Sequence, residues 1–207
     1  MTDEHSKRFG TPAGHVALDF VNTLDGRWGT PEERLKDYFA LVAWTREKRL
    51  LSELHCNRLI ETSYRTPGRG TNILQDAIKL REALYQIFTA IVDRRVVPQN
   101  ALGILNLFLM EGSSYVRLAN NGRHFEWDWL SSNHALNSML WPLARAAADL
   151  LASEDVGRIR QCAAEDCAWF FLDTTRNARK RWCDMKSCGN RVKARRHYQK
   201  VRTAGSP

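Results

Sequence analysis

The sequence has no long apolar segment and no stretch that resembles a secretory leader. A membrane-spanning helix needs about 20 consecutive apolar residues, and every apolar run in this chain of 207 residues is far shorter. The first residues, MTDEHSKRF, include acidic side chains and lack an apolar core segment, unlike a signal peptide. We therefore expect a cytoplasmic protein. In that compartment disulfides are disfavoured, and clustered cysteines more often hold a metal ion.

The common catalytic signatures are missing as well. No serine lies in a G-x-S-x-G motif, the six histidines are dispersed, and neither an H-E-x-x-H pair nor a glycine-rich phosphate loop occurs. There is also no internal repeat and no low-complexity segment. These absences argue against the familiar hydrolase, zinc-protease and nucleotide-binding classes. We predict that the protein is not an enzyme.

Acidic residues are scarce in the last quarter of the chain. Residues 156–207 contain thirteen Arg and Lys but four Asp and Glu, a net charge of +9, whereas residues 1–155 carry a net charge of −1. Such asymmetry is typical of a nearly neutral domain joined to a module that binds a polyanion. We predict two domains, 1–155 and 156–207, with the boundary within residues 153–157.

The pattern of residues 1–155 predicts the mostly helical part of an α+β fold with a small antiparallel sheet. Residues 15–22, HVALDFVN, form a short apolar run that suits a buried strand. Residues 30–33, TPEE, look like a helix start, with Thr30 as N-cap, proline in the first helical position and Glu33 in the capping-box position. Residues 66–72, TPGRGTN, are rich in turn formers and predict a loop.

Further helices are expected along the rest of this region. The strongest pattern covers residues 73–92, where apolar side chains recur at i+3 and i+4 over a wide face. Such a face is typical of a helix in the middle of a bundle. Shorter helices are expected after Ser52 and Pro98. A last helical pattern covers residues 135–152, with a kink or a new start at Pro142.

Residues 115–129, YVRLANNGRHFEWDW, predict a β-hairpin. Asn121–Gly122 suits a two-residue type I′ turn, and this turn would place Leu118 opposite Phe125. One face of the hairpin is apolar and aromatic, so it needs a cover. We expect the strand at residues 15–22 to pair with the hairpin and the helices to pack over both.

Four of the five cysteines lie within 27 positions, in the order C-x4-C-x15-C-x4-C: Cys162, Cys167, Cys183 and Cys188. Four thiolates about 2.3 Å from one ion complete the tetrahedral shell of a structural Zn²⁺ and leave no position for a catalytic water. The loops are at the long end of the usual spacing. The alternative is four unpaired, buried structural cysteines. We predict a small four-cysteine zinc finger, built from a β-hairpin and a C-terminal helix.

The sequence WC-x4-CGNR, with the preceding C-x4-C pair and the phrase FFLDTTRNARKRWC, resembles the CGNR zinc finger family. The signature of that family is Cys188-Gly189-Asn190-Arg191 here. Its members carry an N-terminal domain called ABATE, and LDFVNTLDGRW at residues 18–28 resembles the start of that domain. The resemblance therefore covers nearly the whole chain. It implies a stress-induced transcription regulator of bacteria.

The C-terminal helix is expected to begin at Gly189-Asn190 and to pack Ala194, Tyr198 and Val201 on the finger. We expect double-stranded DNA as the partner. The predicted phosphate contacts are Arg176, Arg179, Lys180, Arg181, Lys193, Arg195, Arg196 and Lys200. Asn190 and Arg191, at the helix start, are the candidates for base contacts. The alternatives are a solvated basic helix without a partner, and a zinc module that binds an acidic protein.

A domain in front of a DNA-binding finger suggests a sensor for a small molecule. The candidate ligand-binding residues are polar or amphipathic and lie at the ends of the first apolar run and on the helix expected after it. They are Asp19, Asn22, Arg27, Trp28 and Trp44. The alternative is that Asp19 and Asn22 cap turns and that Trp44 belongs to the core. A homodimer is also considered as the assembly.

Overall fold

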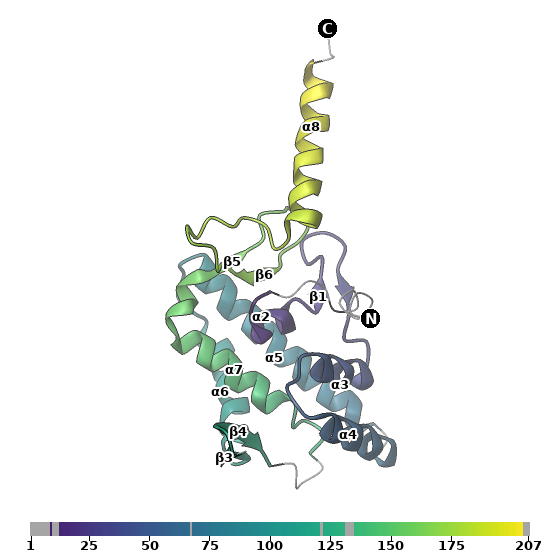
Figure 1. Cartoon of the computed structure of the whole chain (residues 1–207). Helices are drawn as coiled ribbons and strands as arrows, with labels where there is room; N and C mark the ends of the chain where they lie inside the picture. Colours follow the sequence, from purple (N-terminus) through teal and green to yellow (C-terminus); the bar gives the residue numbers. More distant parts are fainter. Residues whose placement is uncertain (1–8, 10–12, 67, 121, 131–134, 205–207) are drawn as a thin grey trace.

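The computed structural model describes residues 9, 13–66, 68–120, 122–130 and 135–204. A helical bundle forms the larger part, and the cysteine-rich segment and a long C-terminal helix lie at one end of it (Figure 1). Within the described residues, the strands form three separate two-stranded sheets, β1-β2, β3-β4 and β5-β6. This arrangement confirms the α+β class, with a helical N-terminal region followed by strands, a cysteine cluster and a helix.

The first apolar run is helical, so the strand predicted at residues 15–22 was wrong. Helix α2 spans Val16–Val21, and the His15 side chain caps it by accepting from the Ala17 backbone N–H at 3.2 Å. Four of its six residues are buried, because the helix is surrounded by other elements. A short, continuous apolar run does not distinguish a strand from a buried helix by its pattern alone.

The helix start predicted at Thr30 was also wrong. Residues Leu24–Asp25 and Glu32–Glu33 pair as strands β1 and β2, and helix α3 begins later and spans Tyr38–Glu47. Its N-cap is Asp37, whose carboxylate accepts from the Ala40 N–H at 2.7 Å. The segment before α3 is extended because Glu33 of β2 pairs with a buried arginine of the bundle.

Glu33 satisfies a buried cation instead of a capping box. Arg81 of the central helix is 2% exposed, and its two Nη atoms donate to the Glu33 carboxylate at 2.7 Å each. Arg81 also donates to Thr23 and to Glu82. Because a buried charge without partners is very costly, this network fixes β2 beside the bundle.

The other predicted helices are confirmed, although the last begins at Leu140 and not at residue 135. Ser52 caps the first of them, and Pro142 lies in the first turn of the last, where a missing N–H removes no helical hydrogen bond. The predicted loop at residues 66–72 is shorter than expected, because helix begins at Arg69; residue 67 lies outside the described residues. The four helices are α4 (Glu53–Arg65), α5 (Arg69–Val92), α6 (Gln99–Ser113) and α7 (Leu140–Ala152).

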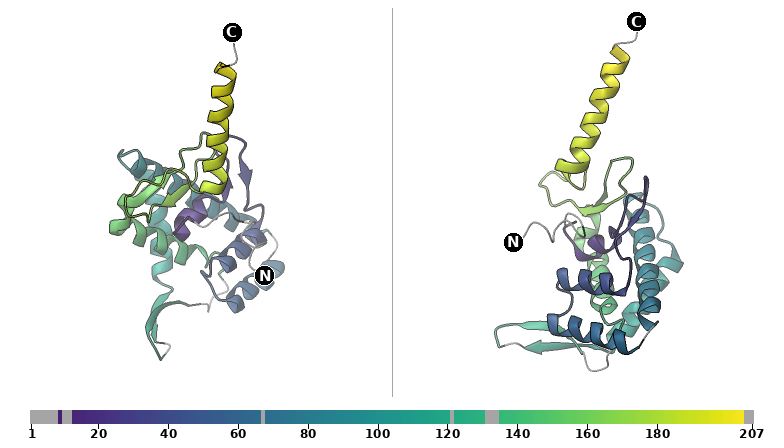
Figure 2. Two further views of the ribbon diagram at one scale, coloured as in Figure 1. Left: turned by 45° about the horizontal axis from the view of Figure 1, so that its top comes forward. Right: turned by 90° about the vertical axis from the view of Figure 1, so that its right-hand side faces the viewer.

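Helix α5 runs through the middle of the bundle, with α6 and α7 on one side and α3 on the other (Figures 1 and 2). Leu80, Leu84, Ile87 and Phe88 of this helix are buried. The same cluster of buried apolar side chains continues into the cysteine-rich segment, where it includes Phe170. The helical region and the finger therefore share one core.

The hairpin of residues 115–129 exists, but its predicted register was wrong by two residues. Strands β3 (Val116–Asn120) and β4 (Phe125–Trp129) place Leu118 opposite Trp127. The predicted turn residue Asn121 lies outside the described residues. The connection is longer than two residues because Asn120 pairs with Phe125.

Local polar contacts account for this register. The Asn120 side chain accepts from the Gly122 N–H at 2.8 Å, an Asx-type contact that stabilises turns. Arg117 donates to Asp128, its cross-strand partner, at 2.9 and 2.7 Å. The hairpin does not pair with a third described strand and extends from the bundle (Figure 2). The strand expected beside the hairpin is absent from the described residues, because residues 15–22 contain helix α2. Arg145 of α7 lies over the Trp127 ring, 5.1 Å from its centroid.

The finger begins with a 3-10 turn over Glu154–Arg158 and continues into the antiparallel strands β5 (Ile159–Gln161) and β6 (Phe170–Leu172). A π-type turn over Met185–Gly189 then leads into helix α8, Asn190–Ala204. Figures 1 and 2 show α8 pointing away from the body of the molecule.

The expectation that α8 packs on the finger was wrong. Ala194 is exposed, Tyr198 is 70% exposed and Val201 is 57% exposed. The apolar side chains of β6 are covered by the bundle instead, where Phe170 contacts Tyr85 and Phe88 of α5 edge to face at 5.5 and 5.8 Å between ring centroids. Within α8, Val192 of the first turn packs against the core, and the three residues expected to pack there do not.

Candidate metal centre and nucleic-acid interface

The four cysteines converge from two separate loops. Cys162 and Cys167 lie in the connection between β5 and β6, Cys183 lies just before the π-type turn, and Cys188 lies within that turn, before α8. The four sulfur atoms all lie within 4.8 Å of one another. The Cys167 and Cys183 sulfurs are 3.7 Å apart, and those of Cys183 and Cys188 are 3.6 Å apart.

This geometry fits one zinc ion. A regular tetrahedron with Zn–S bonds of about 2.3 Å has sulfur–sulfur edges of about 3.8 Å, close to the two separations given above. Cys162, Cys167 and Cys188 are at most 5% exposed, and Cys183 is partly exposed. No histidine or carboxylate belongs to this cluster of described residues. Four sulfurs and no open position are the donor set of a structural Zn²⁺ site.

The thiols perturb one another strongly. Hydrogen bonding with the Cys162 sulfur raises the pKa of both Cys167 and Cys183 above the ordinary thiol value, and burial adds to the effect. Four negative sulfurs so close together need a cation, since like charges in one site disfavour ionisation. Zn²⁺ supplies that charge, and its binding is therefore coupled to deprotonation and to folding.

Arg191 of the CGNR signature turns back toward the metal ligands. Its Nη2 atom donates to the Cys188 sulfur at 3.3 Å and to Asp166 Oδ1 at 2.9 Å, and Arg195 donates to Asp166 Oδ2 at 2.9 Å. Burial alone would raise the pKa of Asp166, but the Arg195 hydrogen bond and the Arg191 charge hold it below its usual range. Sequence reasoning missed Asp166. The available signal was its position inside the first C-x4-C loop of a basic module.

Asp173 organises the basic loop that follows β6, and sequence reasoning missed this residue too. Its carboxylate is buried and accepts from the Thr175 hydroxyl, from the Thr175 N–H at 3.0 Å and from the Lys180 N–H at 2.9 Å. Burial alone would raise the pKa of Asp173, but these hydrogen bonds outweigh it and hold the pKa below its usual range.

The predicted DNA contacts of the loop are exposed on its outer side: Arg176, Arg179, Lys180 and Arg181. Within α8, Lys193 and Arg196 are exposed, and Lys200 lies one turn further along the helix. Asn190 is exposed, and its side-chain amide donates to the Lys186 carbonyl at 3.2 Å. The loop and the helix lie at the same end of the molecule (Figure 1). Contact of these residues with DNA stays a prediction.

Among the predicted ligand-binding residues, Asn22 joins the two parts of the chain. It is 3% exposed, and its side-chain amide donates to the Phe170 carbonyl at 2.8 Å while its oxygen accepts from the Phe170 N–H at 2.9 Å. Asp19 accepts from the Ala13 N–H at 2.6 Å and pairs with Lys48 at 3.0 Å.

The other three predicted ligand-binding residues have different neighbours. Trp44 is fully buried against Phe20. Arg27 pairs with Glu82 at 2.7 and 2.8 Å, and Trp28 is 51% exposed. The structure thus gives each of the five its own set of neighbours. Binding of a small molecule by these residues stays a prediction.

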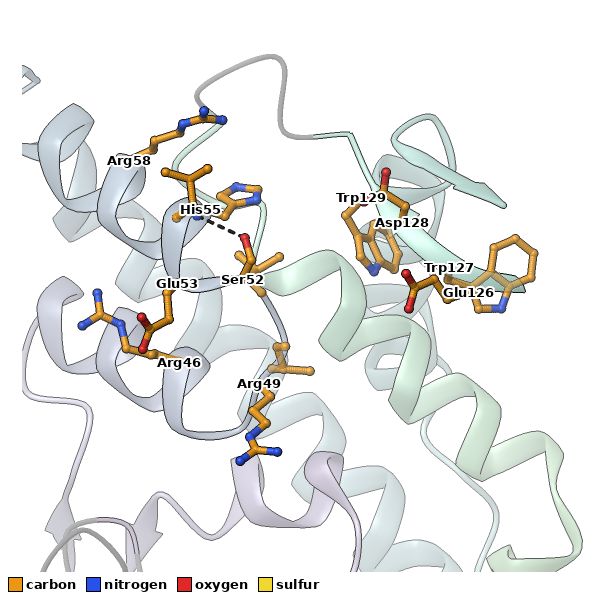
Figure 3. Close-up of a pocket in the computed structure, with 13 residues that line it drawn as sticks. Arg46, Arg49, Ser52, Glu53, His55, Arg58, Glu126, Trp127, Asp128 and Trp129 are labelled. Carbon is orange, nitrogen blue, oxygen red and sulfur yellow. Dashed lines mark hydrogen bonds between the residues drawn. The ribbon is translucent and has the colours of Figure 1, made fainter. Parts of the chain in front are cut away.

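A cleft of about 650 Å³ lies elsewhere, between the α3–α4 connection and β4. Trp129 and Glu126 of the hairpin face Ser52 and His55 across it (Figure 3). His55 is half-buried and contacts the Ser138 hydroxyl at 3.0 Å; burial, and then the charge of Arg58, lower its pKa. None of the five predicted ligand-binding residues lines this cleft.

Helices long and apolar enough to cross a membrane are absent from the described part of the chain. No curated protein matches the sequence. Two family models do. Residues 14–154 match ABATE, described as "Putative stress-induced transcription regulator", and residues 158–201 match the CGNR zinc finger. Together with the four-cysteine centre, these matches show that the chain belongs to the ABATE family and carries a CGNR zinc finger at its C-terminal end.

Proposed function

We propose that this protein is a transcription regulator that binds duplex DNA through residues 156–207 and acts in the cytoplasm in response to stress, without catalytic activity. The observation that carries the proposal is helix α8. It points away from the body, its residues 193–199 are exposed, and its sequence contains six Arg and Lys and no Asp or Glu.

Such a helix is expected to have low stability on its own. Isolated helices of this length are marginal in water, and like charges at i,i+4 destabilise them further. Phosphate groups remove that repulsion and release counterions. A 15-residue helix is about 22 Å long, and the major groove of B-DNA admits an α-helix. The zinc centre holds the start of α8, so the free end is presented to the partner.

The basic side chains fall into two groups by their neighbours. Arg191 and Arg195 are bound to Asp166, so a base contact by Arg191 would require it to leave that carboxylate. Lys193 and Arg196 have no ion pair among the described residues. We therefore assign the main phosphate contacts to Lys193, Arg196 and Lys200 and to the basic loop after Asp173.

A salt series tests the proposal. With about 4–6 phosphates neutralised, log K for zinc-loaded protein and duplex DNA should fall with log[salt] with a slope of roughly −4 to −5. Lys193→Gln should weaken binding to all sequences and flatten the slope by about 1. Lys79→Gln is the matched control, because Lys79 is an exposed lysine on α5 in the N-terminal region.

The same titrations test the second candidate, a zinc module that binds an acidic protein. If zinc-loaded protein shows no salt-sensitive DNA binding at low ionic strength, DNA is not the partner of the basic surface. A slope equally reduced by Lys79→Gln would refute the assignment to α8.

We further propose that the N-terminal region senses a small molecule. The support is architectural, because a nearly neutral domain of helices precedes the basic finger and shares its core. A thermal-shift screen of metabolites on the full chain tests this idea, and size-exclusion chromatography with and without a hit tests the homodimer. A screen without any saturable shift would remove the support for sensing.

A further inference from the structure

Asp166 links the two halves of the finger. It lies in the first C-x4-C loop, whereas Arg191 and Arg195 lie one turn apart at the start of α8, after the second cysteine pair. Each oxygen of its carboxylate accepts from a different arginine, at 2.9 Å in both cases. The Arg191 atom that donates to Asp166 also donates to the Cys188 sulfur at 3.3 Å.

We propose that Asp166 and Arg191 are positioning residues that fix helix α8 to the zinc centre. The Arg191 guanidinium bridges a metal-ligand sulfur and a carboxylate from the opposite loop, and Arg195 holds the second carboxylate oxygen. The proposal rests on the four-cysteine centre and not on DNA binding, so it stands or falls separately from the proposed function.

The geometry gives this contact a role beyond that of an ordinary surface ion pair. Exposed pairs contribute about 0–1 kcal/mol, and Asp166 and Arg191 are 30% and 42% exposed in their side chains. Here two guanidinium groups hold one carboxylate, which restricts the direction of the helix. The N–H that Arg191 donates to the Cys188 sulfur also stabilises the negative charge on that sulfur. Groups that contact metal ligands in this way typically change metal affinity by about 10–100-fold when they are replaced.

The contact also explains why α8 keeps its direction although Ala194, Tyr198 and Val201 are exposed. Helix α8 contacts the π-type turn before it, and among the described residues its ion pairs with the rest of the chain are those to Asp166. Without them, the described contacts that hold α8 would be those of its first turn, with the π-type turn and through Val192.

Conservative variants of the full zinc-loaded chain test the proposal. Arg191→Lys keeps the charge, but its ammonium lies one bond nearer the backbone than the Nη2 atom that donates to both acceptors, so it falls short of them. Asp166→Asn keeps the size but loses the charge. We expect both to release zinc to a chromophoric chelator roughly 10-fold faster or more. Arg196→Lys is the matched control, since Arg196 is exposed on the same helix and has no ion pair among the described residues.

A cobalt-substituted protein gives a readout that loss of stability alone would not move. A hydrogen bond to a thiolate stabilises its lone pairs, so removing the Arg191 donor should shift the sulfur-to-cobalt charge-transfer band to longer wavelength. We expect the shift in Arg191→Lys and no shift in Arg196→Lys. Far-ultraviolet circular dichroism shows whether each variant is folded, and Arg191→Lys serves if Asp166→Asn does not fold.

DNA titrations provide an arm with the opposite sign. Asp166→Asn frees two arginines and removes one negative charge, so at equal zinc loading its salt slope should become steeper by about 1–2. If zinc release and the cobalt band are the same in Arg191→Lys, Asp166→Asn and Arg196→Lys, the positioning role is refuted, whatever the DNA result. If those two readouts change while no variant binds DNA, the positioning role holds and the proposed function fails.

Discussion

Replacing Asn22 by alanine should destabilise the whole protein, although Asn22 lies far in sequence from the finger it contacts. Strand β6 is at the edge of its sheet, and its outer side is covered by side chain and loop instead of a third strand. Asn22 pairs with both backbone groups of Phe170, and the Leu172 N–H donates to the Ala13 carbonyl at 2.8 Å. Buried backbone groups need partners, so Asn22 takes the place of a neighbouring strand.

The magnitude follows from the groups left behind. In Asn22→Ala, the N–H and C=O of the buried Phe170 both lose their partners, and each unsatisfied buried group costs about 1–3 kcal/mol. Some relaxation is expected, so we predict a loss of about 2–4 kcal/mol in the free energy of unfolding. For a chain of this length, 1 kcal/mol corresponds to about 2–4 °C in Tm, which gives a decrease of roughly 4–16 °C.

Thermal and urea unfolding of the zinc-loaded chain measure this change. Asn106→Ala is the matched control, because Asn106 is exposed on α6 and alanine is the better helix former, so its stability should not fall. A decrease in Tm below about 1 °C in Asn22→Ala would refute the stabilising role of the pairing between Asn22 and the Phe170 backbone. A ligand whose binding is abolished in a variant of unchanged stability would instead support the expectation that Asn22 contacts a small molecule.

Two further predictions concern the finger. Asp173→Asn should cost about 1–3 kcal/mol, because an amide cannot accept from all the N–H and O–H donors that surround the carboxylate, while Asp155→Asn, at an exposed position, should be neutral in the same melts. Since the pKa of Asp173 is depressed in the folded state, its contribution is present above its unfolded pKa of about 3.9. That contribution is lost as the pH falls through the folded pKa, so the stability difference between Asp173→Asn and the wild type should shrink in acid and not at alkaline pH. Removal of zinc by a chelator should lower the Tm of the main calorimetric transition, because the bundle and the finger share a core. If the main transition is unchanged and only a separate, small transition of the finger is lost, this coupling is contradicted.

The cysteine spacing was sufficient to predict the metal centre, because four thiol ligands within 27 positions suit one metal ion and little else. The long helix α5 was equally predictable, since its apolar face repeats over many turns. These features depend on local pattern or on residue types with a narrow chemistry. The strand predicted at residues 15–22 and the helix start predicted at Thr30 were wrong because each was inferred from a short pattern, without the distant residues that surround it in the fold.

Glu33 illustrates the limit. In the sequence, Thr30 and Glu33 have the spacing of a capping box, which is worth about 1 kcal/mol. In the structure the same carboxylate neutralises Arg81, 48 positions away and buried. The sequence on either side of Glu33 or Arg81 contains no pattern that predicts this pairing. A buried cation that would otherwise lack a partner outweighs a helix cap.

Asn22 and Asp166 show the same limit for the site. Asn22 was noted as a polar residue at the end of an apolar run, and contact with a ligand or a turn-capping role were the two interpretations. The contact that the structure shows is with the backbone of Phe170, 148 positions along the chain. Asp166 was counted as a minor negative charge in a basic module, while the structure places it between two arginines. Each role depends on a contact between residues that are far apart in the sequence, and a local pattern does not predict such a contact.

These contacts form a continuous path from the bundle to the basic surface. Helix α5 holds Phe170 through Tyr85 and Phe88, and β6 leads at once to Asp173, which fixes the basic loop. Closely packed elements transmit a displacement to one another, because protein interiors are poorly compressible. A movement of α2 or α5 would therefore reach the basic loop, which lies between β6 and the metal ligand Cys183. If the basic loop and α8 contact the same duplex, as proposed above, such a movement would change how the two fit the DNA together, and an event in the bundle would then alter DNA affinity.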